Sequence, residues 1–253
     1  MVKVNIYKVD GKTTEQIDLP EVFTTKYRPD LIRKSFNVMH SNQRQAYGAD
    51  PLAGCRHATA SVGKGRGSSR VPRLTQGNRA ALAPCVVGGR RAHPPKSERN
   101  WKEKINKKEK QLAKYSALAA TSNKELVTGR GHKFDEKITL PIIIDDKFET
   151  IKKTKDVINA LDKIGVYDDI LRATNGKHIR SGRGKSRGRK YKTPKSLLIV
   201  TTKDDIFKSS KNLTGVDIVK PKEINIDHLA PGGDPGRLTI FSKSALKEIG
   251  GSN

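Results

Sequence analysis

Residues 196–202 read SLLIVTT, a short run of apolar and β-branched residues without Gly or Pro. Such a run predicts a strand that is buried on both faces of a sheet. Similar runs occur at 141–145 (PIIID), 216–219 (VDIV) and 237–242 (RLTIFS), and stretches with helical periodicity lie between them. Strands that alternate with helices predict an α/β fold class, here a three-layer, mostly parallel sheet with helices on both faces.

The first fifty residues extend this body. Residues 2–7 (VKVNIY) alternate as a strand does, Asp10 and Gly11 form a hairpin turn signal, and 14–19 supply the return strand. A proline suits the first position of a helix, so we expect a helix from Pro29 to Gly48. A second, lysine-rich helix is expected from Ser97 to about Ala120, with Trp101 and Leu112 on its apolar face. Its lysine-rich face is interpreted equally well as a solvated surface or as a nucleic-acid contact.

Positive charge is concentrated in two places. The 253 residues include 51 Lys and Arg against 26 Asp and Glu, a formal net charge of +25. Residues 51–97 and 175–195 each carry nine basic residues and no acidic residue, and together they hold 18 of the 25 surplus charges. Since ordinary protein surfaces mix both signs, this pattern indicates segments that contact a polyanion, with nucleic acid the first candidate.

The two basic segments set the expected domain organisation. Residues 51–97 have neither helical nor strand periodicity, no aromatic residue, and many Gly, Pro and Arg. We therefore expect an α/β globular body at 1–50 and 98–253, an extended and irregular basic internal loop at 51–97, and a second basic loop at 175–195 inside the body. The aromatic Tyr191 of the second loop is expected either to stack on a base or to pack in the core.

Other classes of protein are disfavoured. The longest apolar runs are too short for a membrane helix, and the N-terminus lacks the apolar region of a secretory signal. The two cysteines, Cys55 and Cys85, make neither a disulfide scaffold nor a Cys-rich zinc site, which favours an intracellular, reducing compartment.

Searches for catalytic chemistry return nothing specific. Asp145, Asp146, Asp204 and Asp205 follow strands, where capping and turn formation are favoured over a catalytic or metal-binding cluster. The GKS at 184–186 lacks the earlier glycine of a phosphate loop and precedes a strand rather than following one. The six histidines show no metal-ligand spacing. We therefore predict no enzyme activity, no catalytic residue, no metal and no cofactor.

The loop motifs GKGRGSSRVPR (63–73) and GGRRAHPPKSER (88–99) resemble the internal loop of the L4 family of large-subunit ribosomal proteins, in its archaeal and eukaryotic branch. The resemblance extends over nearly the whole chain. It implies a structural constituent of the large ribosomal subunit, cytoplasmic and present in one copy, that binds and helps to fold large-subunit rRNA. It also implies that the loop tip lines the nascent-peptide exit tunnel, with ribosomal protein L22 among its neighbours.

The resemblance assigns Lys64, Arg66 and Arg70 to the tip side of the loop, and Arg90, Arg91 and Lys96 to its return. Composition adds the remaining candidates, because Arg and Lys neutralise phosphates while Gly allows close backbone approach. The complete set of predicted rRNA-binding residues is Arg56, Lys64, Arg66, Arg70, Arg73, Arg79, Arg90, Arg91, Lys96, Lys177, Arg180, Arg183, Lys185, Arg187, Arg189 and Lys190.

Two alternatives stay open at this point. An RNA-modifying α/β enzyme with basic RNA-binding loops requires a cofactor loop after a strand. A DNA-packaging protein requires equal affinity for duplex DNA and rRNA.

Overall fold

The computed structural model describes residues 3–251. Its internal contacts divide the chain into two compact units. We call residues 1–40 and 104–253 the body, and residues 41–103 the loop unit. The predicted loop boundaries, 51 and 97, both lie inside the loop unit.

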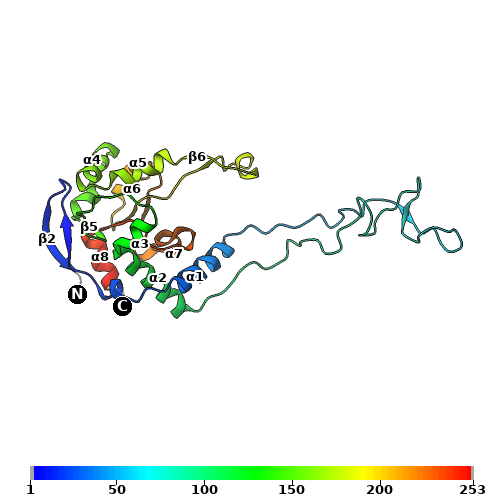
Figure 1. The fold of residues 1–253 in the computed structure, drawn as a ribbon, viewed down its shortest axis with the longest axis horizontal. Coiled ribbons are helices and arrows are strands. Elements are labelled where there is room, and N and C mark those ends of the chain that lie inside the picture. Colours follow the sequence, from blue (N-terminus) through cyan, green and yellow to red (C-terminus); the bar gives the residue numbers. More distant parts are fainter. Residues whose placement is uncertain (1–2, 252–253) are drawn as a thin grey trace. The chain divides into compact units, whose positions relative to one another are not determined.

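A six-stranded sheet forms the centre of the body within the described residues, in the order β2-β1-β5-β10-β8-β9 (Figure 1). The β1–β2 hairpin is antiparallel, and every other neighbouring pair in this sheet is parallel. The prediction of a mostly parallel sheet is therefore confirmed. The strands are β1 (Lys3–Tyr7), β2 (Thr13–Asp18), β5 (Ile142–Ile144), β8 (Leu198–Val200), β9 (Asp217–Val219) and β10 (Thr239–Ser242).

Helices cover both faces of this sheet (Figure 1). One apolar cluster joins a sheet face to α1 (Pro29–Asn42), α2 (Lys107–Ser122), α7 (Ile226–Leu229) and α8 (Lys243–Gly250). The other joins the opposite face to α3 (Lys124–Gly129), α4 (Thr154–Ile164), α5 (Tyr167–Asn175) and α6 (Asp205–Ser210). Successive residues of β5 alternate between the two clusters, with Ile143 in the first and Ile142 and Ile144 in the second. This alternation makes the three-layer architecture, because neighbouring side chains of a strand point to opposite faces.

Single helical turns connect these elements. They are η1 (Glu21–Thr24), η2 (Asp146–Thr150), η3 (Arg183–Ser186), η4 (Pro221–Glu223) and η5 (Pro231–Gly233). Two short two-stranded ribbons complete the secondary structure, β3 (Thr59–Ala60) with β4 (Arg73–Leu74) and β6 (His178–Ile179) with β7 (Tyr191–Lys192).

Two predicted helix boundaries are wrong. Helix α1 ends at Asn42, before the expected Gly48, and α2 begins at Lys107, ten residues after Ser97. Except for 104–106, the residues left out of the two helices belong to the arms of the loop unit, where contacts between the arms replace helical hydrogen bonds. Leu112, expected on the apolar face of α2, is 41% exposed, whereas Ala113 and Ala117 are buried.

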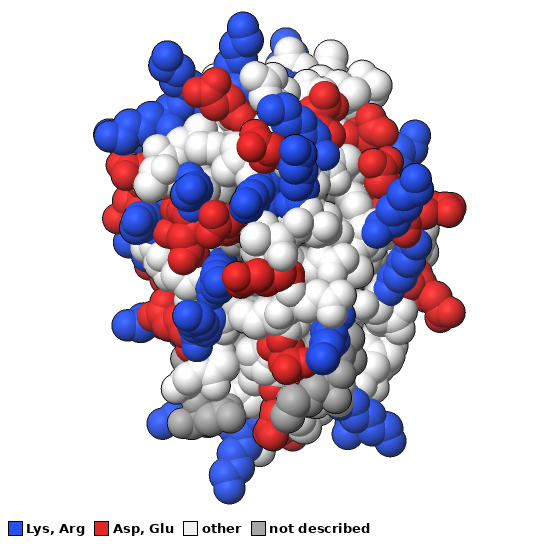
Figure 2. All heavy atoms as spheres, turned by 90° about the vertical axis from the view of Figure 1, so that its left-hand side faces the viewer, with Lys and Arg blue, Asp and Glu red and all other residues white. Residues whose placement is uncertain are grey.

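Charge on the body is mixed. Figure 2 shows a face on which basic and acidic side chains are interspersed. Ion pairs such as Lys243 with Glu15 and Lys220 with Asp204 account for part of this balance. Among residues 3–251, no helix is long and apolar enough to span a bilayer.

Candidate nucleic-acid interface

The loop unit begins as two arms that run side by side. Backbone N–H of Ala49 donates to the carbonyl of Pro95 at 2.8 Å. Farther out, the arms are so close at Gly54 that a Cβ there would lie 2.6 Å from Cα of Arg90. Gly54 also has φ +76, so glycine suits this position for two reasons. The two arms are therefore held together by backbone contacts. Neither apolar cluster includes a residue of 41–103, so no apolar core supports this pairing.

The base of the arms is fixed by polar contacts around Trp101. The Ser41 hydroxyl donates to the carbonyl of Trp101 at 2.7 Å, and Asn42 accepts the backbone N–H of Glu103 at 3.0 Å. The guanidinium groups of Arg44 and Arg99 lie 4.0 and 4.3 Å from the centre of the Trp101 ring. Trp101 was expected in the α2 core; it is instead packed by two arginines, a contact that helical periodicity does not reveal.

The distal part of the loop unit contains the short β3–β4 ribbon, in which Thr59 pairs with Leu74 and Ala60 with Arg73. Between these strands lies the GKGRGSSR motif. Gly63, Gly65 and Gly67 all have positive φ, and a Cβ on any of them would meet nothing within 4 Å. The predicted contact residues Lys64, Arg66 and Arg70 are exposed along this open turn.

The second basic segment is a hairpin in the body. Strands β6 and β7 pair His178 with Lys192 and Ile179 with Tyr191, and η3 lies in the connection. Tyr191 is 51% exposed, so the expectation that it might pack in the core is wrong. The ammonium groups of Lys177 and Lys190 lie 4.9 and 5.6 Å from its ring centre. An exposed aromatic ring between two cations is a suitable surface for a nucleobase next to phosphates.

The predicted rRNA-binding residues share one electrostatic property. Of these sixteen cations, only Arg56 has an ion pair among the described residues, with Asp50. Arg73 and Arg180 are half-buried and the other fourteen are exposed. By contrast, cations outside the two segments such as Arg28, Lys34 and Lys243 each have a carboxylate partner. Because the two segments contain no acidic residue, their unpaired cations make up most of the net positive charge of the chain, which is the property that a phosphate-binding surface requires.

The acidic residues at the strand ends serve structural contacts. The Asp145 carboxylate accepts the backbone N–H of Asp146, and the Asp146 carboxylate accepts that of Ser244, both at 2.9 Å. Asp204 pairs with Lys220 at 2.8 Å. Within residues 3–251, no group of three or more His, Cys, Asp or Glu side chains could hold a metal ion.

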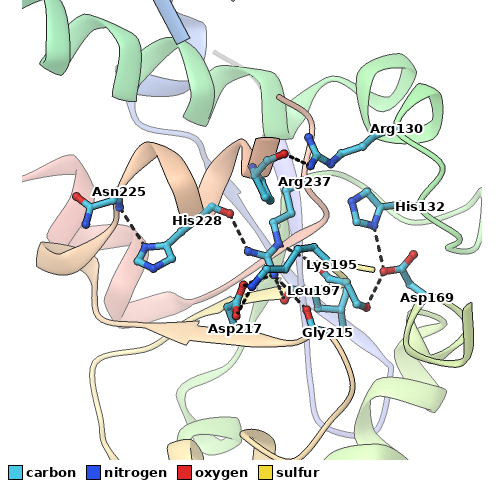
Figure 3. Close-up of polar contacts among 12 residues, drawn as sticks. Arg130, His132, Asp169, Lys195, Leu197, Gly215, Asp217, Asn225, His228 and Arg237 are labelled. Atoms are coloured by element: carbon cyan, nitrogen blue, oxygen red, sulfur yellow. Dashed lines mark hydrogen bonds and ion pairs between the residues drawn. The ribbon is translucent and has the colours of Figure 1, made fainter. Parts of the chain in front are cut away.

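A buried polar network, which the sequence did not reveal, lies beside the second segment (Figure 3). Arg237 is fully buried; its guanidinium donates to the carbonyls of Ser196 and His228 at 2.8 Å and pairs with Asp217 at 2.7 Å. Burial lowers the pKa of Arg237, while Asp217 favours its charged form. These contacts connect β8, β9 and the start of β10, so one side chain joins three strands.

Next to it, the Asp169 carboxylate is fully buried among donors. It accepts from Arg172 Nε at 2.8 Å and from the Ser196 hydroxyl at 2.7 Å, and it lies 3.0 Å from His132 Nδ1. Burial alone would raise the pKa of Asp169, but these donors outweigh it and hold the pKa well below its usual range. Burial also lowers the pKa of His132 despite the carboxylate, so the imidazole is neutral at pH 7.

Comparisons with a family profile and with individual proteins identify the same family. The profile of the ribosomal protein L4/L1 family matches residues 17–252. The protein named large ribosomal subunit protein uL4 of Methanosphaera stadtmanae is 47% identical over 251 residues, which cover 99% of this chain and 97% of that protein. The proteins of the same name from Archaeoglobus fulgidus and Methanocaldococcus jannaschii are 48% and 49% identical, each over 98% of both chains. A profile match and relatives of this similarity, both nearly as long as the chain, show that it belongs to the ribosomal protein L4/L1 family.

Proposed function

We propose that the chain is a structural constituent of the large ribosomal subunit in the cytoplasm, and that it binds large-subunit rRNA as a ribonucleoprotein component of translation. The names of its relatives support the assignment to the subunit. The observation that carries rRNA binding is the unpaired charge: fifteen of the sixteen predicted rRNA-binding cations have no acidic partner among the described residues.

The loop unit is the proposed rRNA-penetrating element. A segment with paired arms, no apolar core and exposed arginines has little stability of its own, and RNA phosphates would supply the missing partners. Glycines at the GKGRG turn let the backbone approach phosphates closely. As the family resemblance implies, its tip would line the peptide exit tunnel close to ribosomal protein L22.

The β6–β7 hairpin is the proposed second rRNA contact. Its cations would bind the phosphate backbone, and Tyr191 would stack on an unpaired base. Both segments act by positioning and charge neutralisation, so the chain has no catalytic part in this function.

Sedimentation of a tagged chain through a high-salt gradient tests the proposal. We expect one copy per large subunit, retained through the wash. A variant with Lys64, Arg66 and Arg70 changed to Gln is expected to lose retention, whereas the matched body variant with Lys152, Lys155 and Lys208 changed to Gln is expected to keep it. Release of the unmodified chain at high salt, or its recovery with DNA or free RNA, would contradict the proposal.

A further inference from the structure

The body contains a cavity of about 760 Å³, most of whose lining residues lie outside the two basic segments. Its walls come from α3, the 192–195 stretch that begins at the last residue of β7, and the 231–235 stretch that precedes β10. Its volume lies within the range of sites that hold small organic ligands, about 300 to 1,000 Å³. The cavity is therefore large enough for one nucleotide.

The walls of the cavity are electropositive. Five cationic side chains line it against two carboxylates, Glu125 and Asp234. Some of the cations are engaged elsewhere, as Lys195 is with Asp217. Two have donors to spare: Lys192 has no ion pair, and Arg172 uses Nε and one amino group for its contacts but not Nη1. Among residues 3–251, Lys192 and Arg172 Nη1 thus remain available as donors to one phosphodiester group.

His132 contributes an acceptor of a different kind. Its side chain is 2% exposed, and it lines the cavity. Because the Asp169 carboxylate only accepts hydrogen bonds, the proton of the neutral ring lies on Nδ1, and Nε2 carries a lone pair. In Figure 3 this second nitrogen faces away from Asp169, and it has no partner in the described part of the chain. Nε2 is therefore accessible from the cavity, where it can accept a hydrogen bond from a donor such as a hydroxyl group.

Apolar groups complete the lining. Tyr27, 40% exposed, lies on the wall with Leu126 and Pro194. At Gly129 and Gly232, a Cβ would meet nothing within 4 Å, so these two lining positions leave space that a side chain would fill. A ring, a proline and backbone without a Cβ are surfaces against which a planar base can pack.

We propose that this cavity binds one unpaired ribonucleotide of an RNA chain: Arg172 and Lys192 contact its phosphodiester, and His132 Nε2 accepts a hydrogen bond from its ribose 2′-hydroxyl. The base packs against Tyr27 and Pro194. Deoxyribose lacks the donor and leaves Nε2 unpaired, so the cavity distinguishes RNA from DNA. This inference rests on the proposed RNA-binding function and adds the feature that the basic segments lack, namely a reason to prefer RNA.

The test is an NMR titration of the full chain with the dinucleotides ApA and dApdA at 0.2 M salt. We expect ApA to bind about five- to tenfold more tightly, which corresponds to the net contribution of one hydrogen bond. His132→Asn preserves a donor to Asp169 and removes Nε2, so the preference should fall to about one through weaker ApA binding alone. The matched control His40→Asn, on exposed α1 surface, should keep the preference.

A second variant tests the cavity independently of the histidine. Gly129→Leu places a side chain in the open space, and it should weaken both dinucleotides at least tenfold. Equal binding of ApA and dApdA by the unmodified chain, an unchanged preference in His132→Asn, or full binding by Gly129→Leu would each overturn the proposal. Subunit sedimentation reports separately on the proposed function, so a chain that remains in the subunit but shows no ApA preference refutes the cavity alone.

Discussion

At the scale of single residues, Arg237 makes a large contribution to the stability of the body. Its guanidinium donates to the carbonyls of Ser196 and Leu197, just before β8, and Asp217 balances its charge. Removing this buried cation leaves the carbonyls without their donor and leaves Lys195 as the remaining partner of Asp217, which costs about 3 to 5 kcal/mol.

We therefore expect Arg237→Met to lower the free energy of unfolding by at least about 3 kcal/mol. Urea denaturation followed by far-UV circular dichroism measures this value. Arg28→Met serves as the control, because Arg28 forms an exposed pair with Asp30 and its loss should leave the midpoint unchanged. A loss below 1 kcal/mol in Arg237→Met would show that other groups satisfy these carbonyls.

His132 predicts a pH dependence. Folding lowers its pKa below the ordinary 6.5, so the unfolded chain takes up the proton first as pH falls. Stability should therefore decrease below about pH 6.5, by at most about 1.4 kcal/mol per pH unit for this group. His228, whose pKa burial also lowers, adds to the same trend.

Comparison of urea midpoints at pH 7.5 and 5.5 measures this effect. His132→Asn should show a smaller decrease between the two values than the unmodified chain. The same decrease in both would assign the dependence to other groups.

At the scale of elements, the interior strands were predictable because they are apolar on both faces. The runs at 141–145, 196–202 and 237–242 contain the interior strands β5, β8 and β10, and the run at 216–219 contains β9 at the edge of the sheet. The ends of α1 and α2 were not predictable from periodicity. Ser41 contacts Trp101 across sixty residues, and this long-range contact ends a helix that the local pattern would continue.

The loop can be shortened at a point that the structure supplies. Gly54 lies against Gly89 and Arg90, so a deletion of residues 55–87 can join Gly54 directly to Gly88. Since no residue of 41–103 belongs to either apolar cluster, the deletion should change the body's free energy of unfolding by less than about 1 kcal/mol. Urea denaturation measures it, and failure of the shortened chain to fold would show that the loop stabilises the body.

At the scale of the whole molecule, charge rather than shape was the more readable signal. The sequence located the two acid-free segments, and their cations are mostly exposed and unpaired. It did not reveal the cavity beside His132, because Arg172, Lys192 and Pro231 are far apart in the chain and meet only after folding. Outside these two segments, the sequence shows only that basic and acidic residues are mixed.

The salt dependence of RNA binding should follow from this distribution. Deletion of residues 55–87 removes six basic residues, Arg56, Lys64, Arg66, Arg70, Arg73 and Arg79. If all six contact phosphates, the slope of log K against log salt should become shallower by roughly four to five. Filter binding to an rRNA fragment between 50 and 300 mM salt measures it. An unchanged slope would exclude the loop from phosphate contact in that complex.

The order of the strands also bears on how the chain is made. Strand β10 is one of the last elements to be synthesised, yet it lies between β5 and β8 in the middle of the sheet. Until residues 237–242 are available, β2-β1-β5 and β8-β9 are two separate half-sheets with no neighbour to join them. A chain that stops before residue 237 therefore has no complete body, although it already displays both basic segments. During synthesis of this protein there is thus an interval in which both basic segments exist before the body can fold, and the synthesis of residues 237–242 ends that interval.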